Sequence, residues 1–97
     1  MLKCLIWGNG RIFHQYINTI KYYENLGEIG IVGISSNMVI FDNILGYKCY
    51  NPERVTSLTF DVVIVMADDN LFIEIKKEIE KLGIDKKIVP YKVLTIP

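Results

Sequence analysis

The chain has 97 residues, against about 150 for a typical domain, so it has room for one hydrophobic core and not for two. Hydrophobic residues make up 51% of it, and 11 basic residues balance 11 acidic ones. This composition excludes intrinsic disorder, and the zero net charge argues against binding to nucleic acid or to a membrane surface.

Membrane, secretion and metal signals are lacking in the sequence. No apolar run approaches the roughly 18 to 20 residues of a membrane span, and residues 1–8 are too short for a secretion signal, so we expect a cytoplasmic protein. Cys4 and Cys49 lie in apolar stretches without a CxxC partner, which predicts two buried free thiols rather than a zinc site.

The first two elements follow from residues 2–27. Residues 2–7 are almost entirely apolar and end at Gly8–Asn9–Gly10, which is typical of a central parallel strand covered on both faces. Apolar residues then recur at spacings of three and four up to Leu26, which predicts a helix that ends at Gly27. His14 falls on the solvated face of this helix, so we interpret it as a surface residue.

Residues 28–36 are a second apolar run, which contains Gly30 and Gly33. A strand, a helix and a second strand of this kind form a βαβ unit. A glycine inside a strand marks either a bulge or a place of close packing, and we favour packing against the helix layer.

Residues 37–58 predict an irregular connection, because Asn, Asp, Gly and Pro interrupt short apolar pieces. Within it, residues 47–50 predict a short third strand. Asn51 followed by Pro52 is typical of an N-cap and first position of a short helix.

The last third of the chain repeats the strand and helix pattern. Residues 60–67 give the purest strand signal and belong beside the first strand. Asp68, Asp69 and Asn70 then supply N-cap acceptors and negative charge for a helix that ends at Gly83. Residues 87–89 predict a short strand. Because the following proline cannot donate to a ladder, this strand either lies at the sheet edge or ends at the proline.

These elements predict an α/β fold with a Rossmann-like open parallel sheet, in the order 3-2-1-4-5, and helices on both faces. We expect residues 1–97 to form this single domain. Ligands bind such sheets beyond the carboxyl ends of the strands where the strand order reverses, here between the first strand and residues 60–67.

The glycine turn at this position predicts an anion site. Gly8–Asn9–Gly10 allows a tight turn in which backbone N–H groups approach an anion, and Arg11 adds a charge-assisted contact. The dinucleotide-binding pattern GxGxxG is incomplete, because Phe13 stands where the third glycine belongs. The alternative is a purely structural turn.

The second strand ends without the acidic residue that would bind ribose hydroxyls, and serines stand there instead. Asp68 and Asp69 would repel a pyrophosphate unless the helix N-terminus takes up their charge. Our candidate cofactors are NAD or a nucleotide sugar, and the candidate cofactor-binding residues are Gly8, Asn9, Gly10, Arg11, Ser35 and Ser36.

No residue set in the sequence predicts catalysis or metal binding. The chain has no GxSxG elbow, no YxxxK pair and no paired acids after its first strand. Trp7, Tyr22 and Tyr23 are amphipathic aromatic residues, for which we favour core or dimer packing over ligand stacking.

Four segments carry a resemblance to a known group of proteins: Trp7–Gly8–Asn9–Gly10, Ile31–Val32–Gly33–Ile34, Pro52–Glu53, and Leu82–Gly83–Ile84 with Lys87–Ile88. Over nearly its whole length the chain resembles the Rossmann-like modules that precede a second domain in bacterial surface-polysaccharide biosynthesis proteins. These include sugar-modifying enzymes, glycosyltransferase-associated proteins and FkbM-type methyltransferases. Many of them carry Asp where this chain has Ser35 or Ser36.

The resemblance implies an N-terminal helper module, not catalytic on its own, that binds a nucleotide or nucleotide sugar and whose catalytic partner domain follows Pro97. The alternatives are the NAD(P)-binding part of an oxidoreductase or of a nucleotide-sugar epimerase or dehydratase, and an oligomerisation module. The last would form a homodimer through Tyr22, Tyr23 and the edge strand.

Overall fold

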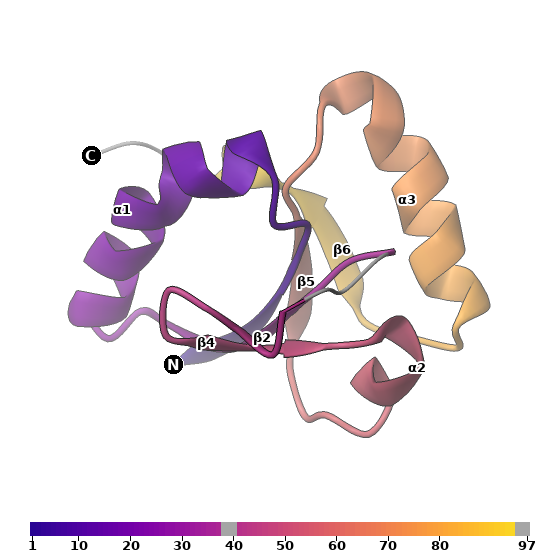
Figure 1. Cartoon of the computed structure of the whole chain (residues 1–97), viewed down its shortest axis with the longest axis horizontal. Coiled ribbons are helices and arrows are strands. Elements are labelled where there is room, and N and C mark those ends of the chain that lie inside the picture. Colours follow the sequence, from indigo (N-terminus) through magenta and orange to yellow (C-terminus); the bar gives the residue numbers. More distant parts are fainter. Residues whose placement is uncertain (38–40, 95–97) are drawn as a thin grey trace.

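In the computed structural model, which describes residues 1–37 and 41–94, helices lie on both faces of a six-stranded sheet (Figure 1). The described elements in chain order are β1 (Leu2–Trp7), α1 (Arg11–Asn25), β2 (Ile29–Ser35), β3 (Asn43–Ile44), β4 (Tyr47–Tyr50), α2 (Pro52–Val55), β5 (Val62–Val65), α3 (Asp69–Lys81), β6 (Lys87–Pro90) and the 3₁₀ helix η1 (Tyr91–Val93).

The sheet is open, mixed and mostly parallel, in the order β3-β4-β2-β1-β5-β6. Strands β4, β2, β1, β5 and β6 lie in the predicted order 3-2-1-4-5. Helices cover both faces of the sheet, as predicted. The prediction of an all-parallel sheet is wrong at one edge, where β3 pairs antiparallel with β4.

The β3–β4 hairpin lies within residues 37–58, which the sequence predicts as an irregular connection. Its two central residues, Leu45 and Gly46, have positive φ angles of 52° and 88°, as two-residue hairpin turns of type I′ require. The side-chain Oδ1 of Asn43 accepts a hydrogen bond from the Gly46 N–H at 3.1 Å. Leucine is an unusual residue at such a position, and β3 has two residues, so the sequence carries no hairpin signal here.

Two hydrophobic clusters lie on opposite faces of the sheet because β1 and β5 are buried on both sides. Cys4 and Ile6 belong to the cluster under α1, whereas Leu5 and Trp7 belong to the cluster under α2 and α3. This alternation confirms the prediction that an apolar run without polar residues forms a doubly covered central strand.

Gly33 in β2 lies both at a bulge and at a place of close packing, the two roles expected of a glycine inside a strand. The register between β1 and β2 shifts at this point, because Cys4 lies opposite Ile31 but Leu5 lies opposite Gly33. A Cβ atom on Gly33 would lie 2.5 Å from the ring of Tyr50. Close packing is therefore confirmed, but the partner is a side chain of β4 rather than the helix layer.

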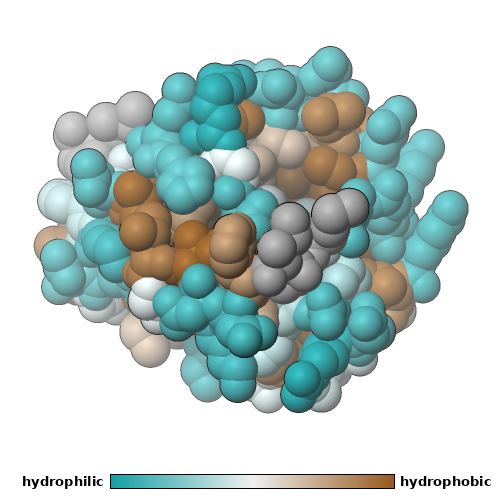
Figure 2. Space-filling model, viewed as in Figure 1, coloured by the Kyte–Doolittle hydropathy of each residue, from teal (hydrophilic) through white to brown (hydrophobic). Residues whose placement is uncertain are grey.

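A polar cluster connects α1 to β4. The Tyr47 hydroxyl donates to Oε1 of Glu24, and Nζ of Lys21 donates to the same hydroxyl at 3.2 Å. Burial and the hydrogen bond to Glu24 raise the pKa of Tyr47 above its ordinary value. Around this cluster, apolar side chains gather between α1 and the β3–β4 hairpin, whereas the outer side of α3 is hydrophilic (Figure 2).

The remaining predictions concern thiols, membrane segments and the chain end. Both cysteines are free, and Cys4 is buried as predicted, but Cys49 is only half-buried. Among residues 1–37 and 41–94, no helix is long and apolar enough to cross a membrane. The apolar chain end is described up to Leu94, and residues 95–97 lie outside the described part.

Candidate functional site

The predicted site lies at the carboxyl edge of the sheet, where β1 and β5 run parallel and side by side. From β1 the chain crosses through α1 to β2 on one side, while β5 and β6 continue the sheet on the other. The strand order therefore reverses between β1 and β5, and ligands of open sheets bind beside the turns that follow two such strands.

Gly8 holds the first turn close to its neighbours. Its φ angle is +113°, and its N–H donates to the Ser35 carbonyl at 2.7 Å. A Cβ atom here would lie 3.0 Å from the carbonyl oxygen of Met66. The Gly8 N–H already donates to Ser35 and is not available to a ligand. The part that remains for Gly8 in the predicted cofactor site is to give the turn its shape.

Gly10 leaves the start of α1 without a side-chain cap. It occupies the N-cap position, makes no side-chain cap bond, and its carbonyl accepts the His14 N–H at 3.2 Å. The first turn of α1 carries no acidic residue. The free N–H groups at this helix start form the positive end of the helix dipole, and no carboxylate in the first turn of α1 compensates it. Asn9, between the two glycines, is half-buried.

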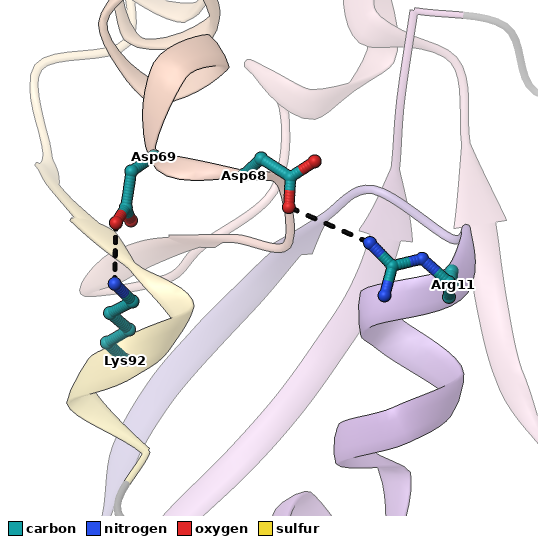
Figure 3. A network of polar contacts seen from close by, with 4 residues as sticks. All are labelled: Arg11, Asp68, Asp69 and Lys92. Carbon is teal, nitrogen blue, oxygen red and sulfur yellow. Dashed lines mark hydrogen bonds and ion pairs between the residues drawn. The ribbon is translucent and has the colours of Figure 1, made fainter.

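Four charged side chains form two ion pairs along this edge, with the two carboxylates lying between the two cations (Figure 3). Nη2 of Arg11 lies 3.8 Å from Oδ1 of Asp68, and Nζ of Lys92 lies 2.5 Å from Oδ2 of Asp69. All four side chains are more than half exposed. The hydrogen bond to Asp69 and the charge of that carboxylate raise the pKa of Lys92.

The start of α3 differs from the prediction in one respect. Asp68 is the N-cap residue, but its carboxylate makes no cap bond, so the predicted side-chain cap is wrong at this residue. Its backbone carbonyl accepts the N–H groups of Leu71 at 2.9 Å and Phe72 at 3.1 Å. The carboxylate turns toward Arg11 instead (Figure 3).

The two serines at the end of β2 have different surroundings. Ser35 is 1% exposed, and its hydroxyl donates to the Tyr50 carbonyl at 2.8 Å, which ties β2 to β4. Its backbone carbonyl reaches Gly8, so the structure brings Ser35 to the glycine turn through the main chain and not through the hydroxyl. Ser36 follows β2 and is half-buried.

Lys92 is the residue of this edge that sequence reasoning missed. It lies in η1, which no periodicity predicts, and it is 23 residues away from Asp69 in the chain. The pair forms because β6 lies beside β5 and delivers η1 to the start of α3. A lysine two residues after the strand-ending Pro90 was the available signal. Within the described parts of the chain, no group of three or more His, Cys, Asp or Glu residues is arranged to hold a metal ion.

The fold and this edge define the chain as an open-sheet α/β domain with a glycine turn at the point where the strand order reverses. The chain belongs to the family described as C2185-like, N-terminal, whose model matches residues 1–89. No curated protein matches the chain. The family description names no activity and no link to polysaccharide biosynthesis, so the resemblance to those modules stays a prediction.

Proposed function

We propose that this domain is a nucleotide- or nucleotide-sugar-binding module of a polysaccharide-biosynthesis protein, not catalytic on its own, and that it binds its ligand at the carboxyl edge. The observation that carries the proposal is the uncapped, acid-free start of α1 beside Arg11, at the reversal of the strand order. The family description as an N-terminal domain is compatible with a second domain, and we propose that this second domain is the catalytic partner.

The chemistry of the edge favours a phosphate group. A helix N-terminus carries about half a positive charge and several unpaired N–H donors, and Arg11 adds a full charge next to it. Because Asp68 and Asp69 offset Arg11 and Lys92, these four side chains sum to zero. Such an edge suits a ligand of few charges, with a phosphate at the start of α1, better than a highly charged ligand.

NAD is the weaker candidate at the same turn. Phe13 is fully buried in the core where the dinucleotide pattern has its third glycine, and the Ser35 hydroxyl is engaged inside the sheet. The third candidate, homodimerisation, is favoured by the 43% exposure of Tyr22.

The test is thermal denaturation of the domain with NAD, NADP, nucleoside diphosphates, and UDP- and CDP-sugars. Saturation at 100 times Kd adds about 2.7 kcal/mol, which raises the Tm of a domain of this size by roughly 10 °C or more. A shift with nucleotides or nucleotide sugars supports the proposal, and a shift with NAD alone supports the alternative. A panel without any shift contradicts both, and sedimentation then tests the homodimer.

Gly10→Asp is the site variant, because it places a carboxylate where the phosphate would lie. A Cβ atom added at Gly10 would meet no heavy atom within 4 Å, and the φ angle is −89°, so the fold tolerates a side chain there. Asn25→Asp, exposed at the far end of α1, adds the same charge and is the matched control. The proposal requires loss of the ligand-induced shift in Gly10→Asp and its retention in Asn25→Asp.

A further inference from the structure

A cavity of about 430 Å³ lies at the opposite edge of the sheet from the candidate site, on the α1 side. Its floor is apolar and consists of side chains from three strands: Cys4 of β1, Val62 and Ile64 of β5, and Val89 of β6. Tyr23 of α1 forms one wall, and Val93 and Leu94 form the other.

The cavity exists because the two faces of the sheet are covered unequally. On one face, α3 packs over β5 and β6. On the other face, α1 packs over β1 and β2, and among the described residues η1 and Leu94 cover β5 and β6. The rings of Tyr16 and Tyr91 meet edge to face at 5.1 Å and join α1 to η1 on the carboxyl side. The space left toward the amino side is the cavity.

The mouth of the cavity carries more negative than positive charge. Glu28, Asp61 and Lys87 line it, and all three are exposed. Asp61 is held in place, because its Oδ2 accepts the backbone N–H of Lys3 at 2.9 Å. Two carboxylates and one ammonium group leave a net charge of −1 beside an apolar interior.

We infer that this cavity binds a small amphipathic cation, with its apolar body over Ile64 and Val89 and its protonated amine between Glu28 and Asp61. A volume of about 430 Å³ lies within the range of small-molecule sites, about 300 to 1,000 Å³, and such sites combine apolar walls with a few polar groups that orient the ligand. The charge of the mouth selects a cation over an anion. This inference concerns the amino edge and does not depend on the proposed function of the carboxyl edge.

The test compares three probes that share one alkyl chain, namely octylamine, octanol and octanoate, by two-dimensional NMR of the domain at pH 7. We expect shifts of the Ile64, Val89 and Val93 methyl signals, with affinity in the order amine, alcohol, acid, and no shift of the Gly8–Arg11 amides. Each added methylene strengthens binding about fourfold, from about 0.8 kcal/mol per buried CH₂, so octylamine binds more than tenfold tighter than hexylamine.

Two kinds of variant separate the apolar body from the charged head. Val93→Trp fills the cavity from a position that is 52% exposed and abolishes binding of all three probes, whereas Leu58→Trp on the other face of the sheet is the control and leaves binding unchanged. Glu28→Gln combined with Asp61→Asn lowers the preference for octylamine over octanol at least fivefold.

Three results overturn the inference: no probe shifts the cavity methyl signals, the three probes bind equally, or Val93→Trp binds octylamine as the wild type does. The inference is also overturned if the same methyl signals change with protein concentration and sedimentation shows a dimer. A second copy of the chain would then be the occupant of the cavity.

Discussion

The two long helices that begin at the carboxyl edge of the sheet, α1 and α3, start in opposite chemical ways. Helix α1 begins after Gly10 with no cap side chain and no acidic residue in its first turn, and its first residue is the cationic Arg11. Helix α3 begins with two carboxylates, Asp68 at the N-cap and Asp69 at the first helical position.

This difference indicates at which helix start a ligand anion binds more favourably. The dipole of α3 is compensated by carboxylates of the chain itself, which hold Arg11 and Lys92 in turn. The dipole of α1 has no such compensation from its own first turn. A negatively charged ligand therefore gains more at α1 than at α3, and the predictions below alter one start at a time.

The largest effect is expected for Gly8→Ala, which disrupts the turn that leads to α1. The methyl group meets the Met66 carbonyl at 3.0 Å in a backbone conformation, φ +113°, that L-residues rarely adopt. We expect a loss of about 1–3 kcal/mol in the free energy of unfolding, measured by urea denaturation.

Gly46→Ala is the matched control for Gly8→Ala. Its φ is +88° but no atom lies within 4 Å of the added methyl group, so it carries the conformational cost without the contact. Equal losses in the two variants would show that the approach to Met66 costs nothing and would contradict the structural role assigned to Gly8.

Gly10→Asp makes the start of α1 resemble that of α3. A carboxylate at the N-cap position stabilises the unliganded domain by about 0.3–1 kcal/mol through its interaction with the helix dipole. The same carboxylate repels a bound phosphate, so the ligand-induced rise in Tm disappears. A variant that is destabilised, or that still binds the nucleotide, would contradict the view that the start of α1 is open to anions.

Asp68→Asn makes the start of α3 less negative. Asparagine is as good an N-cap residue as aspartate, so the helix persists, and Arg11 loses the partner 3.8 Å away. Exposed ion pairs contribute about 0.2–1 kcal/mol, so we expect nucleotide affinity to rise by up to about fivefold. Isothermal titration measures it, and a fall in affinity would indicate that the Asp68 carboxylate itself contacts the ligand.

Much of the fold could be predicted because local signals decide it. The apolar run 2–7 is β1 residue for residue, and Gly27 and Gly83, with φ of +76° and +85°, end α1 and α3 as predicted. The order β4-β2-β1-β5-β6 follows from the burial of the central strands and from right-handed crossovers. The hairpin at Leu45 lacked any such local signal.

Less of the candidate site could be predicted, because partners from distant segments decide what each polar group does. The Ser35 hydroxyl bonds to Tyr50, and the Asp68 carboxylate faces Arg11 rather than its own helix. Both outcomes depend on strand register and on how neighbouring turns face each other. Composition and spacing place these residues at the edge but do not assign their partners.

The smallest effect is expected at the second ion pair of α3. Asp69→Asn removes the negative charge beside Lys92, so the pKa of that ammonium group falls back toward its ordinary value. A raised pKa means that the folded state holds the proton more tightly than the unfolded chain does. The contribution of the pair is therefore present below the ordinary lysine pKa of 10.5 and is lost as the pH rises through the higher, folded value.

An NMR titration of the Lys92 side chain measures the change in its pKa, with Asp85→Asn as the exposed control. An unchanged pKa in Asp69→Asn would mean that Lys92 does not pair with Asp69 in solution. The start of α3 would then carry a carboxylate without the ion pair drawn in Figure 3, and this carboxylate would repel anions more strongly than a paired one.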